Sequence, residues 1–137
     1  MLFAKPSITL GYSLKWPEIA IYNITREHEM SEVIEQIKQQ IETNTVLLYM
    51  KGNPNQPQCG FSARTVQALM ECGKRFAYVD ILTNPEIRAS LPAYANWPTF
   101  PQLWVKGELV GGCDIITEMA ENGELKELID AAIPDEA

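Results

Sequence analysis

The residue of this chain best suited to thiol chemistry is the cysteine of QCGFS (58–62). Cys59 follows a hydrophobic run, VLLYMKG, that is typical of a strand, and precedes ARTVQALMECG, which is typical of a helix. The thiolate is the nucleophilic and metal-binding form of cysteine, and a helix N-terminus or a nearby cation lowers the pKa of the thiol. Lys51, at the end of the predicted strand, is such a cation. In a C-x-x-C redox pair the fourth position is a second cysteine, but here it is Ser62, so no resolving thiol is expected beside Cys59.

The chain's two other cysteines do not restore a neighbouring pair. Cys72 lies in the same predicted helix, roughly 20 Å from Cys59 at about 1.5 Å per residue, which is beyond disulfide reach. We expect Cys72 to pack in the core. Cys113 is predicted at another helix start on the same side of the sheet, so its pairing with Cys59 stays open. Three cysteines are too few for a disulfide-stapled secreted scaffold and indicate a reducing compartment, the cytoplasm.

Composition excludes several classes of function. The chain has 137 residues, which favours one domain, and 46% of them are hydrophobic, which suffices for a core. The net charge of −7 argues against nucleic-acid binding, which favours a basic surface. No apolar stretch reaches the roughly 18 residues that a membrane span requires. We therefore expect neither nucleic acid nor a membrane as a partner.

Hydrophobic periodicity and turn signals predict alternating helices and strands in the order α-β-α-β-α-β-β-α. The first helix is expected to begin at a Ser31 cap, and the last helical region at an Asp114 cap. Residues 51–58 are predicted to form a loop, and Pro92 to break or kink its helix. The expected elements are a helix to 43, a strand at 45–50, a helix from 59 or 60 to 73, a strand at 75–80, a helix at 85–95, strands at 102–105 and 108–110, and helices after 114 and after 123. This order predicts an α/β fold whose mixed sheet has helices on both faces.

Residues 1–29 show no clear hydrophobic period and match neither a secretory nor a transit peptide. We expect them to lie outside the functional domain, residues 30–137. Translation beginning at Met30 and a poorly ordered tail are the two alternatives. The chain's single histidine, His28, falls in this extension and is not expected to be a ligand.

Two long motifs carry a family resemblance. KGNPNQPQCGFS (51–62) resembles the first signature of monothiol CGFS glutaredoxins, and WPTFPQLWVKGELVGGCD (97–114) resembles the second. The likeness covers about residues 31–133 and is greatest to the short, single-domain bacterial members. It implies a thioredoxin-like (glutaredoxin) fold with a four-stranded mixed sheet flanked by helices.

The resemblance also implies a glutathione pocket. Lys51 and Arg88 would hold the glycine carboxylate through charge-assisted hydrogen bonds. Phe100 would pair its backbone with the cysteinyl part, an edge that a cis peptide bond at Pro101 exposes. Without the resemblance, Arg88 would be interpreted as a solvated charge on a helix.

The γ-glutamyl end of glutathione would lie at the start of the next helix. The resemblance assigns it to Cys113 and Asp114, where backbone N–H groups attract its carboxylate and the Asp114 carboxylate attracts its amine. This assignment gives Cys113 a role other than pairing with Cys59.

The family is known for glutathione-bridged [2Fe–2S] clusters at a dimer interface, and the thiolate count fits. Such a cluster needs four thiolates, and one chain offers Cys59 alone. Two chains, each with a bound glutathione, supply the four. The resemblance therefore implies a homodimer through the bridging cluster, a heterodimer with a BolA-like protein, and apo iron–sulfur proteins as recipients.

The motifs and the resemblance are consistent with two functions, and a third function explains fewer of the residues. The first is a carrier and assembly factor for clusters, which the CGFS motif and its long preceding loop favour. The alternative is a glutathione-dependent thiol–disulfide oxidoreductase, at most a weak one, in which Cys59 removes glutathione from protein thiols. A pure interaction module would leave the pocket residues without a role.

Overall fold

The structure of the protein, a computed structural model, describes residues 16–134. The chain divides into two compact units, Met1–Glu32 and Val33–Ala137. Helix α1 (Trp16–Thr43) crosses this boundary, so the helix start predicted at Ser31 is wrong. No glycine or proline lies between Pro17 and Thr43, and Pro17 itself is tolerated in a first turn because its missing N–H has no partner there. The proposed domain limit at residue 30 stays a prediction, and residues 1–15 lie outside the described part.

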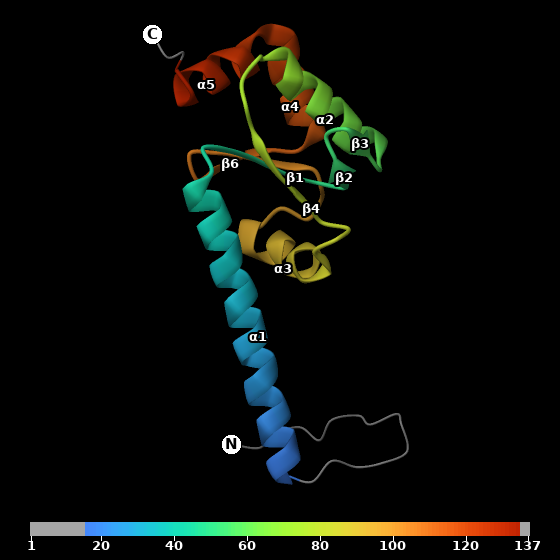
Figure 1. Ribbon diagram of the computed structural model, residues 1–137, viewed down its shortest axis with the longest axis vertical. Helices are drawn as coiled ribbons and strands as arrows, with labels where there is room; N and C mark the ends of the chain where they lie inside the picture. The colour runs from blue at the N-terminus through green and yellow to red at the C-terminus, as the bar shows by residue number, and fades with distance from the viewer. Residues whose placement is uncertain (1–15, 135–137) are drawn as a thin grey trace. The chain divides into compact units, whose positions relative to one another are not determined.

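The second unit is built on a four-stranded mixed sheet with the strand order β4-β1-β5-β6. Strand β1 (Val46–Met50) pairs in parallel with β4 (Ala77–Asp80) and antiparallel with β5 (Gln102–Val105), which pairs antiparallel with β6 (Glu108–Gly111). The fully buried strand β1 thus lies inside the sheet, as its apolar sequence predicts. The predicted thioredoxin-like mixed sheet is confirmed (Figure 1).

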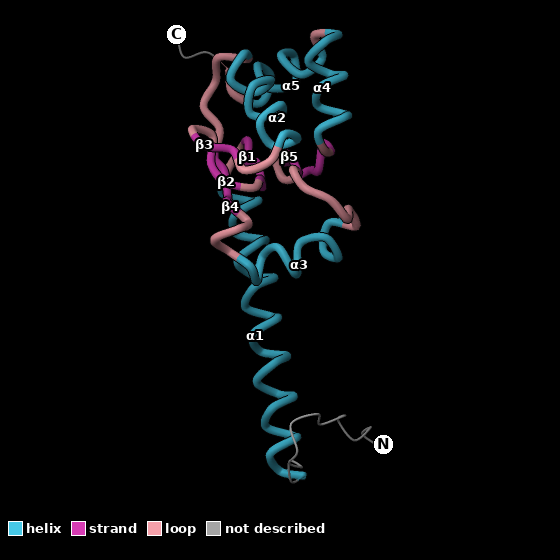
Figure 2. Tube along the Cα trace, turned by 90° about the vertical axis from the view of Figure 1, so that its right-hand side faces the viewer, coloured by secondary structure: helices cyan, strands magenta, loops and turns pink. Residues whose placement is uncertain are grey.

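Helices cover both faces of the sheet, which Figures 1 and 2 show from two sides. One core contains Leu48 and Leu103 of the sheet together with α2 (Gly60–Glu71), α4 (Cys113–Asn122) and α5 (Glu124–Ala132). The other core contains Leu47 and Tyr49 together with α3 (Pro85–Ala95) and the residues of α1 from 33 onward. Neighbouring residues of β1 therefore face opposite layers.

Three local predictions change. Residues 51–58 are not a plain loop but carry a small antiparallel ribbon, β2 (Gly52–Asn53) and β3 (Gln56–Pro57). Helix α3 is not broken at Pro92 but continues to Ala95, although Pro92 has no N–H to donate to the Arg88 carbonyl four residues earlier; the predicted kink stays a prediction. The N-cap of α4 is Gly112, and Asp114 lies within the first turn instead of capping it.

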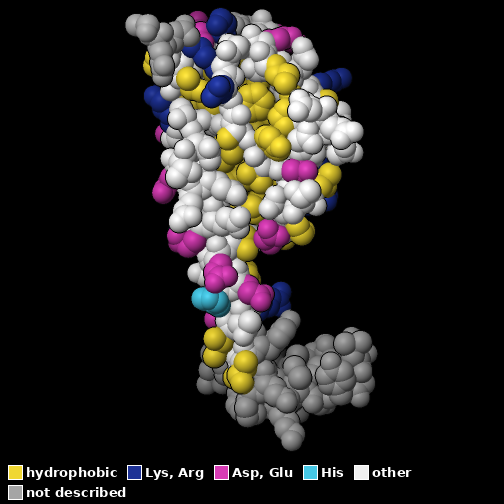
Figure 3. Space-filling view, viewed as in Figure 1, with side chains coloured by type: hydrophobic (Ala, Val, Ile, Leu, Met, Phe, Trp, Pro, Cys, Tyr) yellow, Lys and Arg dark blue, Asp and Glu magenta, His cyan; other side chains and the backbone are white. Residues whose placement is uncertain are grey.

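Two properties of the described residues, 16–134, concern hydrophobic length and the distribution of charge. None of the helices in this part of the chain has the length and hydrophobicity to cross a bilayer. On the face drawn in Figure 3, the described basic side chains are scattered among acidic and neutral ones.

Candidate functional site: a thiol beside a charged pocket

Cys59 lies where β3 turns into α2. It is the N-cap of α2, with extended backbone (φ −155°, ψ 148°), and its sulfur accepts a hydrogen bond from the Ser62 backbone N–H at 3.5 Å. The Cys59 carbonyl accepts from Ala63 N–H at 3.0 Å, which begins the helical ladder. The predicted placement of Cys59 at a helix start is confirmed, and its sulfur takes the place of the oxygen that usually caps a helix.

The local environment favours the Cys59 thiolate. Partial burial is the largest single influence and raises the pKa of the thiol. Hydrogen bonds from the Ser62 backbone and hydroxyl, a further one from the Phe61 backbone and the positive charge of Lys51 together outweigh it. The pKa of Cys59 is therefore held below its usual value, as a nucleophile or a metal ligand requires.

Ser62 is a structural part of the site, because its side chain is completely buried. Its hydroxyl accepts a hydrogen bond from the Lys51 N–H at 3.1 Å. The Lys51 carbonyl accepts from the Gln58 N–H at 2.9 Å. The residues on either side of Cys59 thus hold the backbone of Lys51, and the fourth position of the motif carries a hydroxyl where a dithiol site would carry a second sulfur.

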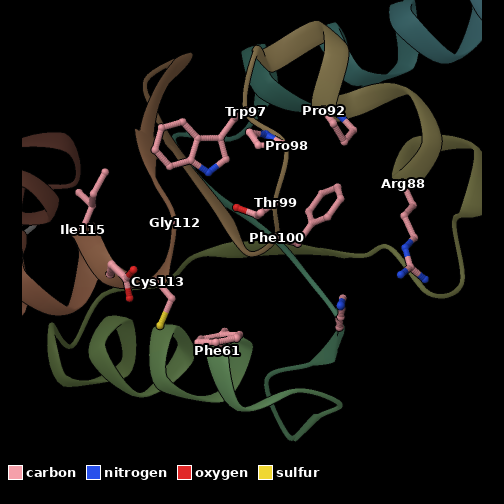
Figure 4. A pocket seen from close by; sticks show the side chains of 12 residues that line it. Phe61, Arg88, Pro92, Trp97, Pro98, Thr99, Phe100, Gly112, Cys113 and Ile115 are labelled. Atoms are coloured by element: carbon pink, nitrogen blue, oxygen red, sulfur yellow. The ribbon is translucent and has the colours of Figure 1, made fainter.

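Next to this thiol lies a pocket of about 580 Å³. It is lined by five of the residues assigned to glutathione on the resemblance: Lys51, Arg88, Phe100, Cys113 and Asp114. Figure 4 shows Arg88 at one end, Cys113 at the other, and the Phe61 and Phe100 rings between them. The other lining residues are Phe61, Pro92, Trp97, Pro98, Thr99, Gly112 and Ile115.

Two assigned residues lie beside the pocket and do not line it. Cys59 precedes Gly60 and Phe61, and the Phe61 ring forms part of the wall with 58% of its surface exposed. Pro101 follows a cis peptide bond to Phe100, as the resemblance implies. Their binding roles stay predictions.

Trp97 and Gly112 are two of the seven lining residues that were not assigned from sequence, and both lie inside the second motif. A Cβ added at Gly112 would lie 3.3 Å from the Pro101 carbonyl oxygen and 3.4 Å from Trp97 Nε1. The missing side chain therefore lets the start of α4 approach the Phe100–Pro101 segment closely. The consecutive glycines of GELVGGCD were the available signal for this approach.

The charges of the pocket suit a peptide-like ligand with unlike ends. Lys51 and Arg88 provide cations, and Arg88 presents a planar fork that matches a carboxylate. Asp114 provides an anion in the first turn of the ten-residue helix α4, whose free N–H groups attract a second carboxylate. A ligand with two carboxylates and one amine would find a partner for each.

The remaining cysteines have different settings. Cys72 is buried in the core, which confirms its predicted packing, and burial raises the pKa of its thiol. Cys113 is also buried, with its sulfur 3.8 Å from Thr117 Oγ1. All three cysteines are free thiols, and whether Cys113 pairs with Cys59 stays open. Within residues 16–134, no three His, Cys, Asp or Glu side chains are grouped as a metal site would need.

Comparison with known proteins defines the family. The Glutaredoxin family model matches residues 46–110. Glutaredoxin 4 of Escherichia coli K12 is 70% identical over 100 residues, which cover 73% of this chain and 87% of that protein. Glutaredoxin 4 of Haemophilus ducreyi is 65% identical over 98 residues, 72% of this chain and 92% of that protein. The chain belongs to the glutaredoxin family.

Solved structures agree with this assignment. The solution structure of reduced poplar apo GrxS14 is 41% identical with a TM-score of 0.65, covering 75% of this chain and 94% of that one. The mature form of Trypanosoma brucei 1CGrx1 is 30% identical with a TM-score of 0.66, covering 96% and 87%. A buckwheat glutaredoxin–glutathione complex, at 20% identity and a TM-score of 0.68 over 77% and 94%, shares the fold.

Proposed function

We propose that this glutaredoxin is of the monothiol CGFS type and carries [2Fe–2S] clusters in the cytoplasm. The observation that carries the proposal is the buried Ser62 hydroxyl, bonded to the Lys51 N–H at 3.1 Å, in the position of a resolving thiol. Cys59 has a lowered thiol pKa and no sulfur beside it in its motif. In such a site the Cys59 thiolate has to combine with a thiol that a second molecule supplies.

We propose that glutathione supplies this second thiol. Its glycine carboxylate would meet Lys51 and Arg88, its cysteinyl backbone would meet Phe100 beside Pro101, and its γ-glutamyl end would meet the start of α4. The charges that line the pocket support this orientation, with cations from the residue after β1 and from α3, and an acidic first turn in α4. The exposed Phe61 ring would cover part of the tripeptide beside Cys59.

The donor set fits a shared cluster, which is the protein's cargo. Four thiolates hold a [2Fe–2S] cluster, and the described part of one chain contains no group of three ligating side chains. Cys72 is buried in the core and Cys113 lines the pocket, so neither is proposed as a cluster ligand. Cys59 of two copies and the thiolates of two glutathiones would complete the set. A BolA-like protein would replace the second copy in a heterodimer, and apo iron–sulfur proteins would receive the cluster.

Anaerobic reconstitution with iron, sulfide and glutathione tests the ligand assignment. We expect the wild-type chain to gain the visible charge-transfer bands of a [2Fe–2S] cluster and Cys59→Ser to gain none. The matched control is Cys72→Ser, which removes a buried thiol outside the site and should keep the bands. A retained cluster in Cys59→Ser would disprove the assignment.

A second function is favoured by the low thiol pKa of Cys59, which also suits an attacking nucleophile. The Cys59 thiolate would attack the glutathione sulfur of a protein–glutathione disulfide and release the protein thiolate. A second glutathione thiolate would then attack the Cys59–glutathione disulfide, which forms oxidised glutathione and restores Cys59. A colourless monomer that rapidly reduces a glutathionylated protein would favour this oxidoreductase over the carrier.

A further inference from the structure

Asp80 is the last residue of β4, and its carboxylate contacts the residue after Lys51. The parallel register of β1 and β4 ends at Met50 and Asp80. Past the ends of the two strands, the Asp80 carboxylate oxygen Oδ1 accepts two backbone hydrogen bonds, from Gly52 N–H at 3.0 Å and from Leu82 N–H at 2.8 Å. Because Gly52 is buried, its N–H needs a partner, and the Asp80 side chain provides it.

The first of these bonds fixes the segment that carries Lys51. The Lys51 N–H is held by Ser62 and its carbonyl by Gln58, while the next N–H along the chain, that of Gly52, is held by Asp80. Gly52 adopts a positive φ of 87°, so the chain bends sharply there. The Asp80 bond therefore anchors the far side of the Lys51 bend.

The same residue also fixes the start of the helix that carries Arg88. The Asp80 carbonyl accepts a hydrogen bond from Asn84 Nδ2 at 2.8 Å, and Asn84 is the N-cap of α3. The Asn84 carbonyl in turn accepts from the Arg88 N–H at 3.1 Å. Asp80 thus joins the segment after β1 that carries Lys51, through its carboxylate, to helix α3 that carries Arg88, through its backbone carbonyl.

We propose that Asp80 is a positioning residue for carboxylate recognition: it fixes the Lys51 bend against the start of α3 and so sets how the two cations present themselves to a ligand. The inference rests on the proposed function, since the ligand carboxylate is the glycine end of glutathione. Asp80 acts through Lys51 and Arg88 and needs no contact with the ligand. Both backbone N–H groups donate to Oδ1 and not to the other carboxylate oxygen. The position of Oδ1 should therefore affect the placement of Lys51 more than the negative charge of the carboxylate does.

Three substitutions separate position from charge. Asp80→Asn loses the charge but can keep an oxygen in place for both N–H groups. Asp80→Glu keeps the charge but moves the oxygens by one methylene, and Asp80→Ala removes both. The matched control is Asn53→Ala, because Asn53 Oδ1 likewise accepts two backbone N–H groups of the same segment, from Asn55 at 3.0 Å and Gln56 at 2.9 Å, at the tip of the ribbon.

The readout is calorimetric binding of two ligands by the full chain. One is S-methylglutathione, whose capped sulfur forms no disulfide, and the other is its analogue with the glycine carboxylate replaced by a carboxamide. We expect the wild type to prefer the carboxylate ligand roughly tenfold, as charge-assisted hydrogen bonds warrant. Asp80→Asn and Asn53→Ala should keep this preference, whereas Asp80→Ala and Asp80→Glu should lose most of it while binding the carboxamide as the wild type does.

The outcomes distinguish the inference from the proposed function. A wild type that binds neither ligand overturns both. A wild type that prefers the carboxylate, with Asp80→Glu unchanged and Asp80→Asn impaired, shows that Asp80 acts through its charge and overturns the inference alone. Equal preference in all Asp80 variants overturns it as well. If Asp80→Ala fails to fold, as judged by far-UV circular dichroism, the Asn and Glu variants still decide.

Discussion

At the scale of single residues, the site depends on the buried hydroxyl of Ser62. Ser62 accepts from the Lys51 N–H at 3.1 Å, and its hydroxyl is one of the groups that lower the pKa of Cys59. A buried hydroxyl that accepts a backbone N–H satisfies that donor and holds its neighbour in place. Serine at this position therefore supports the thiolate as well as removing a competing thiol.

We expect Ser62→Ala to raise the pKa of the Cys59 thiol. The alkylation rate of a thiol follows its thiolate fraction, so the pH at half-maximal rate should move upward. Mass-resolved alkylation by iodoacetamide between pH 4 and about pH 10 reads Cys59 separately from the other cysteines. Ser62→Ala should also lower the free energy of unfolding by about 1–3 kcal/mol, because it leaves the Lys51 N–H without its partner.

The matched control for Ser62→Ala is Thr65→Val. Thr65 is also fully buried in α2, and its hydroxyl donates to the Phe61 carbonyl at 2.9 Å but does not contribute to the lowered pKa of Cys59. It should leave the pH profile of Cys59 in place. An equal shift in both variants would mean that loosening of α2, and not the Ser62 hydroxyl, controls the thiol.

Residue types and spacing identified Cys59 as the reactive residue. The hydrogen bonds that hold the segments around Cys59 became visible only in the structure. The cap position was predictable because a polar loop leads directly into a helical pattern. The roles of Asp80 and Ser62 were not, because each depends on a contact between segments far apart in sequence, 28 residues for Asp80 with Gly52 and 11 for Ser62 with Lys51. The family resemblance assigned Arg88 to the pocket, where the sequence alone would have left it as a solvated charge on a helix.

At the scale of elements, the ribbon of β2 and β3 is the part that brings Lys51 and Cys59 together. Gly52 is essential to it, because a Cβ there would lie 2.5 Å from the Gln56 carbonyl oxygen and 2.9 Å from the Gln58 backbone nitrogen. Those atoms belong to the backbone and have little room to move. The ribbon therefore excludes a side chain at its first residue.

We expect Gly52→Ala to destabilise the chain more than Gly73→Ala. Both glycines have a positive φ, +87° and +75°, so both substitutions carry a backbone strain of about 1–2 kcal/mol. Only Gly52 adds a steric clash, since nothing lies within 4 Å of a Cβ at Gly73. Urea unfolding should show an extra loss of about 1–3 kcal/mol for Gly52→Ala. Equal losses in the two variants would contradict the close packing of the ribbon.

Element prediction succeeded where periodicity was strong and failed at short or uninterrupted segments. The strand at 45–50 and the helix at 85–95 lie within a residue of β1 and α3. The ribbon was missed because two-residue strands have no period. The start of α1 was missed because Ser31, a good cap by type, also fits inside a helix when no helix breaker precedes it.

At the scale of the whole molecule, the proposed carrier is incomplete as a single chain. One copy provides Cys59 and a pocket of about 580 Å³, so two of four cluster ligands must come from another protein and its glutathione. Assembly would therefore couple three events: glutathione binding, cluster binding and dimer formation. Ligand binding of this kind shifts the dimer equilibrium by mass action.

The measurement that tests this account most directly is the composition of the reconstituted species. The protein is reconstituted anaerobically with iron, sulfide and glutathione and separated by size, and iron, sulfide, glutathione and protein are then quantified in the coloured peak. We expect a dimer with two irons and two glutathiones for each pair of chains, and no coloured dimer when glutathione is omitted, because the four thiolates come from two Cys59 side chains and two glutathiones. A coloured species that forms without glutathione, or that elutes as a monomer, would contradict the central claim.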